Sequence, residues 1–188
     1  MEMSHPLEIQ KGAIDGPMMV RPRQFGDDRG HFSETWRQGH FEAALGRPIH
    51  FVQDNESVSG AGVLRGLHFQ VPDMAQEKLV RVVRGAALDV VVDLRRNSAT
   101  YGQYQTALLT GENRWQFWVP EGFAHGFLTL EPDTIFCYKC TEVYSPDHER
   151  SLRWNDPDLA IDWGTKAPLL SQKDAAAPAF TDFDSPFT

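Results

Sequence analysis

The middle of the chain is a succession of short runs of β-branched, aromatic and other apolar residues, separated by glycine, proline, asparagine or aspartate. The runs cover residues 78–83, 87–94, 104–109, 115–119, 123–130 and 134–144. Short strands at this spacing predict an all-β sandwich or barrel, and the jelly roll is the common version at this chain length. We expect residues 78–83 and 87–94, on either side of Gly85, to form a hairpin or tight strand pair.

The N-terminal part of the chain carries turn and cap signals. Residues 10–23 predict a first strand region with a turn at Gly16-Pro17, and residues 25–36 predict a Gly/Asp-rich turn followed by alternating side chains. A short helix is predicted from Gln38 to Leu45, because Gly46 and then Pro48 end it.

The regular pattern fades after Asp147 into loops and single turns that we expect to pack over the barrel, with short helices only at the periphery. A chain of 188 residues builds one well-buried core rather than two. We therefore expect a single domain over residues 1–188, with its core at about 8–175 and a C-terminal tail at 176–188. The tail is rich in alanine and proline and is expected to fray.

Charge and hydropathy exclude two classes of function. The formal net charge of −8 argues against a nucleic-acid binder, which needs a basic face to neutralise phosphates. No segment is long and apolar enough to span a membrane, and residues 1–6 have no cationic stretch leading into an apolar run. We expect a cytoplasmic protein without a membrane partner. An anionic small ligand would need a local cluster of basic side chains.

Cys137 and Cys140 form a C-x-x-C motif, which can indicate redox activity or a zinc site. Residues three apart on a strand point to opposite faces, and there is no second cysteine pair to complete a zinc site. The motif therefore favours two reduced, packed thiols.

The first candidate functional segment is Val63–Gln70, which places Arg65 and His68 inside an apolar run. Strict alternation would put these two side chains on opposite faces of a strand. Both reach one cavity only if Gly66 hosts a bulge or bend. The alternative is a hydrogen-bonded core histidine beside a surface arginine.

The second candidate segment, Pro120–Gly126, contains P-x-G-x-x-H and resembles the second motif of the cupin superfamily, whose histidine commonly binds metal. Its histidine here is His125. Gln70 stands where the first cupin motif would place another histidine, and the next candidates are Glu77 and Lys78. An ammonium and an amide make a poor metal shell, so a metal-binding cupin is the second interpretation.

The third candidate segment, Phe136–Tyr144, carries Tyr138 and Tyr144 at positions of the same parity. Along a straight strand both rings would lie on one face, about 20 Å apart. One would work near the floor of a cavity and the other near its rim. Two core tyrosines with satisfied hydroxyls are the alternative.

Taken together, the segments resemble the dTDP-4-dehydrorhamnose 3,5-epimerase family over nearly the whole chain. The matching motifs are Phe25-Gly-Asp-Asp-Arg-Gly, Gln53-Asp-Asn-x-Ser57-x-Ser59, Leu64-Arg-Gly-Leu-His68-x-Gln70, Lys78-Leu-Val-Arg-Val-x-x-Gly85, Asp89-x-x-x-Asp93-x-Arg95, Pro120-x-Gly-Phe-Ala-His125-Gly-Phe, Tyr138-x-Cys-Thr-x-x-Tyr144, Trp154-Asn-Asp-Pro157 and Ser171-x-Lys173-Asp174. Phe69, where tyrosine is often found, and Gly164, where proline is usual, depart from the pattern.

The resemblance implies a cupin-like jelly roll, a double-stranded β-helix, that inverts a thymidine-diphosphate 4-keto-6-deoxyhexose at the carbons flanking the ketone. By this resemblance His68 is the base, Tyr138 the acid, Asp174 the partner that orients His68, and Lys78 the cation that stabilises an enolate. Further matching positions imply contacts to the substrate, at Arg29, Glu34, Gln53, Asp54, Asn55, Arg65, His125, Tyr144, Glu149 and Lys173. Tyr144 resembles the ring that stacks on thymine.

The same resemblance implies a homodimer in which the N-terminal segment reaches the neighbouring chain, and chemistry without a metal, nicotinamide or flavin. The chain has no Gly-rich dinucleotide fingerprint. The same residues are compatible with inversion at both carbons or at one alone. They are equally compatible with a product that is used to make rhamnose or another deoxysugar. A nonenzymatic sugar-nucleotide binder of the same fold would be expected to lack the catalytic set, which is present in full.

Overall fold

The computed structural model describes residues 7–188. Its strands are β1 (Leu7–Lys11), β2 (Met18–Pro22), β3 (Gln24–Asp27), β4 (Gly30–Ser33), β5 (Gln53–Ser59), β6 (Leu64–Gln70), β7 (Lys78–Arg84), β8 (Ala86–Asp93), β9 (Tyr104–Thr110), β10 (Gln116–Val119), β11 (Phe123–Thr129), β12 (Thr134–Cys140) and β13 (Glu149–Ser151). Two short α-helices, α1 (Gln38–Leu45) and α2 (Gln172–Ala175), and the 3₁₀ turn η1 (Phe180–Asp182) complete the described elements.

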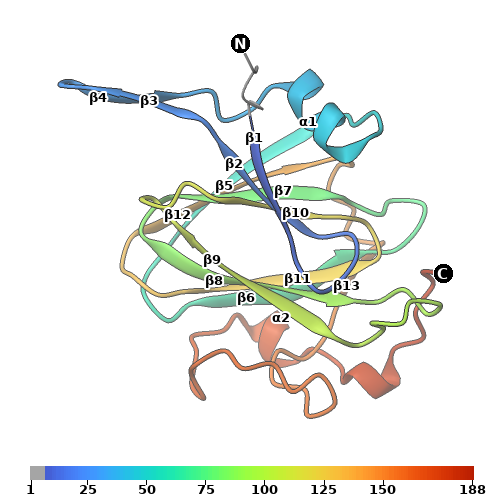
Figure 1. Cartoon of the computed structure of the whole chain (residues 1–188). Helices are drawn as coiled ribbons and strands as arrows, with labels where there is room; N and C mark the ends of the chain where they lie inside the picture. Colours follow the sequence, from blue (N-terminus) through green and yellow to red (C-terminus); the bar gives the residue numbers. More distant parts are fainter. Residues whose placement is uncertain (1–6) are drawn as a thin grey trace.

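Two sheets face each other to form the predicted jelly roll (Figure 1). One has six strands in the order β1-β2-β10-β7-β12-β5, and the other has five in the order β13-β6-β11-β8-β9. Every pairing within them is antiparallel. The all-β prediction is therefore confirmed.

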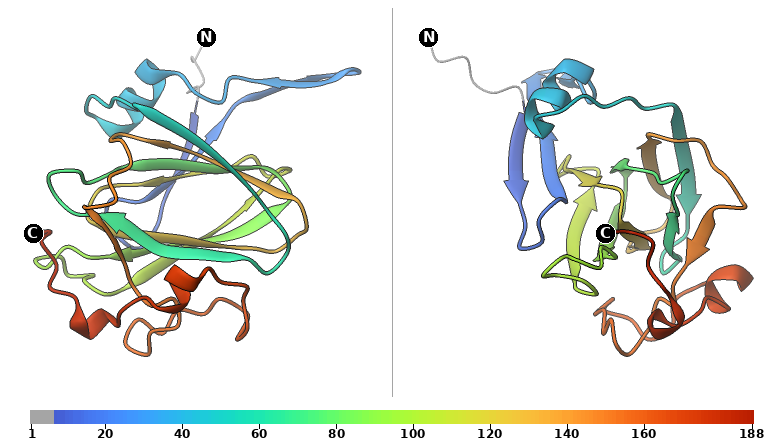
Figure 2. Two further views of the ribbon diagram at one scale, coloured as in Figure 1. Left: turned by 180° about the vertical axis from the view of Figure 1, so that it is seen from behind. Right: turned by 90° about the vertical axis from the view of Figure 1, so that its right-hand side faces the viewer.

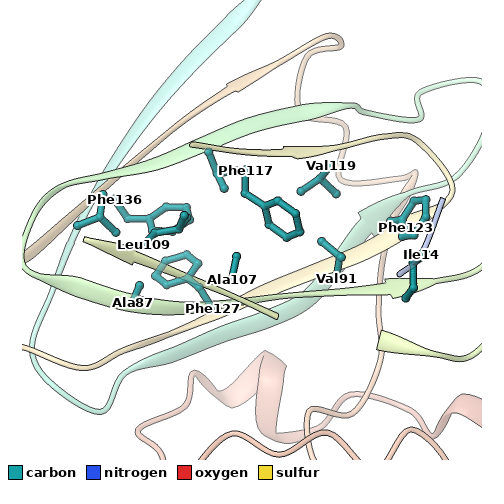
Figure 3. Packing of buried hydrophobic residues seen from close by; sticks show 12 residues of the cluster. Ile14, Ala87, Val91, Ala107, Leu109, Phe117, Val119, Phe123, Phe127 and Phe136 are labelled. Carbon is teal, nitrogen blue, oxygen red and sulfur yellow. The ribbon is translucent and has the colours of Figure 1, made fainter. Parts of the chain in front are cut away.

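The interior between the two sheets is filled by side chains at alternate strand positions. Val80 and Val82 of β7 and Phe136 of β12 face Val91 of β8 and Phe127 of β11 in one apolar cluster. Figure 3 shows rings and aliphatic side chains from both sheets meeting there. At one end of this interior the apolar pattern gives way to polar side chains, and the candidate site lies at that end.

Other segments cover parts of the outer faces of both sheets. The five-stranded sheet packs Leu64, Leu67 and Phe69 against the segment after β13, including Leu152 and Trp163. Figure 1 shows this C-terminal segment as a layer beneath the sheet, as expected from the sequence. The helix α1 covers part of the other sheet, where the buried Phe41 contacts Trp118 edge to face. The helix has the predicted bounds, and Gly46 ends it in the left-handed conformation.

The expected hairpin between residues 78–83 and 87–94 is wrong. β7 pairs with β10 and β12, whereas β8 pairs with β11 and β9, so the two strands belong to different sheets. Gly85 adopts a φ of 79° between them and carries the chain from one sheet to the other. A Cβ there would lie 2.4 Å from the Thr134 hydroxyl oxygen, so the crossing requires glycine.

The C-terminal tail does not fray as composition suggested. Phe187 is 7% exposed and packs, together with Phe183, against Phe69. The Ser185 hydroxyl donates to the carbonyl oxygen of Leu94, and Arg96 N donates to the carbonyl oxygen of Phe187. Burial of these apolar rings outweighs the disorder that alanine and proline favour.

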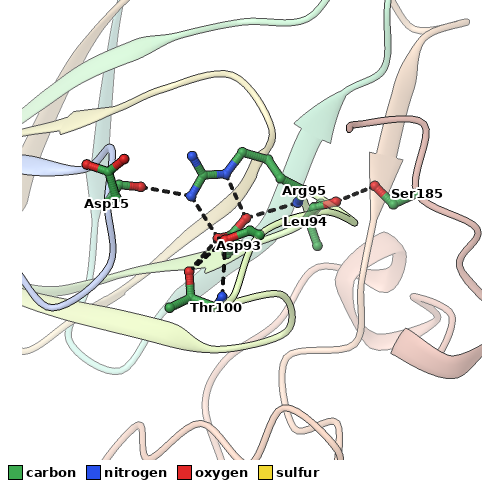
Figure 4. Close-up of polar contacts among 7 residues, drawn as sticks. Asp15, Asp93, Leu94, Arg95, Thr100 and Ser185 are labelled. Carbon is green, nitrogen blue, oxygen red and sulfur yellow. Dashed lines mark hydrogen bonds and ion pairs between the residues drawn. The ribbon is translucent and has the colours of Figure 1, made fainter.

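A buried carboxylate fixes the end of β8 beside this tail. Asp93, fully buried, accepts hydrogen bonds from Arg95, Ser98 and Thr100, and Arg95 also donates to the carbonyl oxygen of Asp15 (Figure 4). Burial would raise the pKa of Asp93, but these hydrogen bonds hold it below its usual value. The cluster is a structural clamp between the β1–β2 loop and β8.

The β3–β4 hairpin stands away from the two main sheets and projects outward (Figure 2). It forms its own two-stranded sheet, and its rings Phe25 and Phe32 are 53% and 69% exposed. Within residues 7–188, no helix has the length and apolar character needed to cross a membrane. The start of the chain, on which our expectation of no leader segment depends, lies outside the described residues.

Candidate active site

The bulge predicted at Gly66 is present and brings Arg65 and His68 to the same face of β6. The register of β6 against β11 shifts between the pairs His68–His125 and Arg65–Phe127. Gly66 has a φ of 140°, and a Cβ there would lie 2.5 Å from the Cα of Gly126. No other residue fits this bend, which directs both polar side chains into the sandwich.

These side chains open onto a cavity of about 260 Å³ between the two sheets. It is lined by Ser57, Arg65, His68, Lys78, His125, Phe127, Phe136, Tyr138, Ser171, Lys173 and Asp174. The four residues predicted to be catalytic all lie in this one lining, although they come from β6, β7, β12 and α2. The cavity holds basic groups in an overall acidic chain, as an anionic ligand requires.

His68 and Asp174, the pair that the family resemblance implied, are joined by a hydrogen bond. The His68 Nε2 atom lies 2.5 Å from the Asp174 Oδ1 atom. Asp174 is held in turn by its place at the start of α2, where its backbone N–H donates to the Ser171 hydroxyl. With the carboxylate as acceptor, Nε2 carries the proton of the neutral ring and Nδ1 is the free base.

Burial would raise the pKa of the Asp174 carboxyl, but the hydrogen bond and the charge of His68 hold it below its usual value. Asp174 is therefore ionised at neutral pH. It can hold the His68 ring in one orientation and stabilise the imidazolium that forms when the ring takes a proton.

Lys78 carries an ammonium group into this interior from the first position of β7. The residue is 9% exposed, and its side chain has no hydrogen-bond or ion-pair partner in the described part of the chain. Burial lowers the pKa of Lys78, and the nearby Cys140, Asp89 and Glu149 oppose that shift. A desolvated cation without a fixed partner is well placed to stabilise negative charge on a ligand.

Tyr138 enters the cavity from β12, where it lies opposite Asn55 of β5. Burial raises the pKa of its hydroxyl, with a further increase from Cys140, and Arg65 partly offsets both. The hydroxyl therefore stays protonated over the physiological range and is available as a proton donor. It arises from the sheet opposite the one that carries His68.

The second histidine, His125, has its own carboxylate. Its Nε2 atom lies 2.9 Å from Oδ2 and 3.0 Å from Oδ1 of Asp89, which is fully buried on β8. Burial raises the pKa of Asp89, and His125 and Lys78 oppose the shift. Asp89 stands in one of the family motifs, but no role at the site was predicted for it; an aspartate at an inward position of the run Ala86–Asp93 was the available signal.

Several other residues predicted to contact the substrate lie around the rim of the cavity. Lys173 forms an ion pair with Glu149, and the Tyr144 hydroxyl donates to the same carboxylate at 2.7 Å. The Gln53 carboxamide accepts from the backbone N–H of Tyr144 and donates to Asn55. These contacts form a continuous polar border from β5 to α2.

The prediction that Tyr138 and Tyr144 lie on one straight strand is wrong. β12 ends at Cys140, and Tyr144 lies in the following loop with 53% of its surface exposed. The loop is held by Gln70, whose side chain accepts from Ser145 N and donates to the carbonyl oxygens of Val143 and Met74. An exposed ring on a fixed loop suits stacking on a ligand better than a core position does.

Three of the predicted contacts do not reach this cavity within one chain. Asp54 points to the outer face of β5 and pairs with Lys139 at 2.7 Å. Arg29 lies at the tip of the β3–β4 hairpin, 90% exposed and paired with Asp27. Glu34 pairs with Arg37 and lines a separate hollow of about 340 Å³ beside α1.

The C-x-x-C thiols are free, as predicted. Cys140 faces inward opposite Lys78 of β7, whereas Cys137 contacts Glu56 on the outer face. Burial raises the pKa of both thiols. Among residues 7–188, no group of three or more His, Cys, Asp or Glu side chains is arranged to hold a metal ion. Gln70, at the cupin ligand position, is committed to the loop contacts described above.

The fold and the cavity define an acid–base enzyme on a cupin-like jelly roll. The family model described as dTDP-4-dehydrorhamnose 3,5-epimerase matches residues 11–182. The chain belongs to this family of isomerases, and it is an epimerase.

Three relatives illustrate the similarity. The dTDP-4-dehydrorhamnose 3,5-epimerase of Pseudomonas aeruginosa is 53% identical over 95% of this chain and 98% of its own. The Legionella pneumophila dTDP-6-deoxy-D-glucose-3,5-epimerase, in complex with dTDP-4-keto-L-rhamnose, is 46% identical with a TM-score of 0.91 and 95% coverage of both chains. A 3'-monoepimerase from Streptomyces bikiniensis, in complex with dTDP-quinovose, is 36% identical with a TM-score of 0.85, covering 90% of this chain and 86% of its own.

Proposed function

We propose that the protein converts dTDP-4-dehydro-6-deoxy-D-glucose to dTDP-4-dehydro-L-rhamnose by inverting C-3 and C-5, through acid–base chemistry in the cavity around His68. The observation that carries the proposal is the convergence of an oriented imidazole, a buried ammonium and a protonated phenol on one lining. A cavity of about 260 Å³ suits a hexose, and the nucleotide would lie across the rim.

The reaction begins when Nδ1 of His68 takes the proton from a carbon next to the ketone. The electron pair moves to the ketone oxygen, and the enolate forms beside the Lys78 ammonium, which stabilises it most strongly because the cavity excludes water. Asp174 balances the imidazolium formed on His68. The proton that is removed is acidic only because this negative charge is stabilised.

Inversion requires that a proton return to the opposite face of the same carbon. Tyr138 donates it, the enolate collapses to the ketone, and the phenolate that remains recovers a proton from solvent as His68 releases its own. His68 and Tyr138 belong to opposite sheets, so a sugar ring between them presents one face to each. Repeating the cycle at the second flanking carbon needs only a shift of the ring.

The substrate is held by the basic and aromatic groups around the cavity. Arg65, His125 and Lys173 attract the diphosphate and sugar oxygens, and Tyr144 stacks on thymine at the rim. Gln53, Asn55 and Glu149 complete the polar border. Asp54, on the outer face of β5, contributes through its backbone or its effect on Lys139 rather than by reaching the cavity.

We also propose a homodimer that completes the site. The projecting β3–β4 hairpin, with its exposed phenylalanines, reaches the neighbouring chain and delivers Arg29 and Glu34 to the partner's cavity. Mixing an Arg29→Ala variant with a His68→Asn variant tests this. Random exchange of subunits would restore one intact cavity per mixed dimer, or about a quarter of all sites. No recovery on mixing would mean that each chain uses its own Arg29.

The decisive test of the reaction is incubation with dTDP-4-dehydro-6-deoxy-D-glucose in heavy water, with NMR observation of both ring positions. Deuterium and inverted configuration at C-3 and C-5 support the proposal. Incorporation and inversion at one carbon would identify a single-position epimerase of a deoxysugar pathway. Binding without incorporation at either carbon would identify a nonenzymatic sugar-nucleotide binder.

A further inference from the structure

The inner face of β5 carries a row of four polar side chains, at Gln53, Asn55, Ser57 and Ser59. Three of them have partners in the wall of the sandwich. Gln53 bonds to Tyr144 and Asn55, the Asn55 amide lies 3.8 Å from the Cys140 sulfur, and the Ser59 hydroxyl accepts from the Arg65 guanidinium at 3.1 Å. The row is thus tied into the structure at every position except one.

Ser57 is the exception. Its hydroxyl oxygen is buried and has no hydrogen-bond partner in the part of the chain that the structure covers. The residue lines the cavity with His68 and Tyr138. A buried polar group without a partner is costly, and native proteins rarely leave one without a reason. Because no bond fixes the hydroxyl, rotation about the Cα–Cβ bond can turn it toward a ligand.

The position of Ser57 within the cavity indicates which part of the sugar it meets. Ser57 lies opposite Phe136 of β12, between the pair Asn55–Tyr138 on one side and Ser59, which holds Arg65, on the other. In the proposed reaction Tyr138 works on the carbons flanking the ketone, and Arg65 attracts the diphosphate carried by C-1. Between C-1 and the two reacting carbons lie C-2, which carries a hydroxyl, and the ring oxygen, which carries no hydrogen. Of these two, only the 2-hydroxyl can both donate to and accept from a serine.

We propose that Ser57 is a specificity-determining residue that hydrogen-bonds the 2-hydroxyl of the sugar. The inference rests on the proposed function and adds a recognition contact to it. A serine hydroxyl both donates and accepts, which matches a sugar hydroxyl. The apolar C-6 methyl has a different surface available, because the Phe127 and Phe136 rings stack 3.8 Å apart in the same lining (Figure 3).

This contact gives the enzyme a means of rejecting 2-deoxy sugars. A site built to bond a hydroxyl discriminates strongly against the analogue that lacks it, because the protein group is then left unpaired. The buried Ser57 hydroxyl is unpaired without a ligand, and a 2-deoxy ligand would leave it unpaired. The 2-hydroxyl relieves that penalty.

Titration calorimetry with two stable sugar nucleotides, dTDP-glucose and dTDP-2-deoxyglucose, tests the assignment without turnover. We expect the parent protein to bind dTDP-glucose about five- to tenfold more tightly. Ser57→Ala should bring the ratio of the two Kd values close to one, mainly by weakening dTDP-glucose. Ser57→Cys, which replaces the hydroxyl by a somewhat larger thiol that donates only weakly, should give an intermediate ratio. The matched control is Val58→Ala, which changes an exposed side chain on the opposite face of β5 and should leave the ratio at the parent value.

Equal affinity of the parent for both nucleotides, or a ratio that Ser57→Ala leaves unchanged in a folded protein, would overturn the assignment of Ser57 while leaving the proposed reaction intact. If the parent bound neither nucleotide, the proposed function would fail together with the contact. The deuterium experiment on the unmodified protein separates these two failures, because it does not depend on Ser57.

Discussion

His68 and His125 lie directly opposite each other on β6 and β11, and each imidazole is bonded to a different buried carboxylate. Their accessibility differs: the His68 side chain is 28% exposed, whereas that of His125 is 8% exposed. A base must reach the substrate proton, and the more accessible ring, with Nδ1 free, meets that requirement. The deeper pair, His125 and Asp89, is suited to holding the substrate.

The two histidines should therefore respond differently to substitution. We expect His68→Asn to lower kcat by about 10²- to 10⁴-fold while the Kd for dTDP changes little. His125→Asn should weaken substrate binding and retain measurable turnover. Steady-state kinetics with calorimetry of dTDP binding separates the two effects. Complete loss of turnover in His125→Asn with activity retained in His68→Asn would reverse the assignment.

Lys78→Met should bind nucleotide almost normally and lose most of its turnover, because the ammonium matters chiefly when the enolate forms. The comparison of kcat with the Kd for dTDP-glucose checks this. Lys78→Arg, which keeps the charge, serves as the control and should retain part of the activity. A raised KM with kcat unchanged would make Lys78 a binding residue.

The buried ammonium also predicts a pH-dependent stability difference. Burial places the pKa of Lys78 in the folded protein below its value in the unfolded chain, which is about 10.4. Below the folded pKa the charged group destabilises the fold, and this penalty declines as pH rises toward the unfolded pKa. Lys78→Met should therefore be more stable than the parent at neutral pH, with an advantage that shrinks on the alkaline side. Urea unfolding at several pH values measures it; an advantage that grows with alkaline pH would contradict the prediction.

Tyr138→Phe removes one hydroxyl and leaves the ring volume nearly unchanged, so the fold should survive. His68 can still form the enolate and exchange its proton with solvent, but inversion lacks its donor. In heavy water we expect the variant to incorporate deuterium into the substrate faster than it makes the epimer, whereas the two rates stay closer in the parent. If exchange and inversion fell by the same factor, the assignment of the two faces would have to be abandoned.

Tyr144→Ala should weaken binding of dTDP by about 1–3 kcal/mol, the usual contribution of a base stacked on an aromatic ring. Tyr144→Phe is the matched control, because it keeps the ring and loses only the hydrogen bond to Glu149. Calorimetry of dTDP binding compares the two. Equal losses in both variants would show that the hydroxyl, rather than the ring, carries the contribution.

Phe187→Ala should lower the free energy of unfolding by about 3–5 kcal/mol, the usual cost of removing a buried phenylalanine ring. Phe187 lies beyond the residues that the family model matches, yet its ring is almost fully buried. Urea unfolding measures the effect, with the exposed Leu130→Ala expected to stay within about 0.5 kcal/mol of the parent. Similar stability of both variants would show that the tail is an unconstrained extension.

The strands in the middle of the chain, the helix α1 and the bulge at Gly66 could be predicted because each leaves a local signal. β13 was missed, because it lies in the segment after Asp147 where we expected only loops and single turns. Arg65 and His68 share a face only if the strand bends, and Gly66 is the residue that permits the bend. Which other strand a given strand pairs with leaves no such local signal in the sequence. Gly85 has a positive φ, which is compatible both with a hairpin turn and with a connection between two sheets. Which of the two forms is decided by how the whole sheets pack.

The residues of the candidate site could be predicted only where the family resemblance identified them. Asp174 lies 106 residues after His68 in the sequence, and no local pattern links them. The composition of the tail suggested disorder. The tail is ordered because Phe183 and Phe187 are buried against a surface formed by strands that are distant in the sequence. Asp89 could be recognised from the sequence as a carboxylate at an inward strand position. The unpaired hydroxyl of Ser57 could not, because only the folded structure shows which groups surround it.

The C-terminal layer beneath the five-stranded sheet has a consequence for how the chain is made. During synthesis β6, β8 and β11 emerge before the segment that covers Leu64, Leu67 and Phe69. Until that segment arrives, a newly made chain presents a wide apolar sheet face, and such surfaces promote aggregation of folding intermediates. Asp174 belongs to the same late segment, so the His68–Asp174 pair on which the proposed reaction depends and the cover over this face form together, at the end of folding.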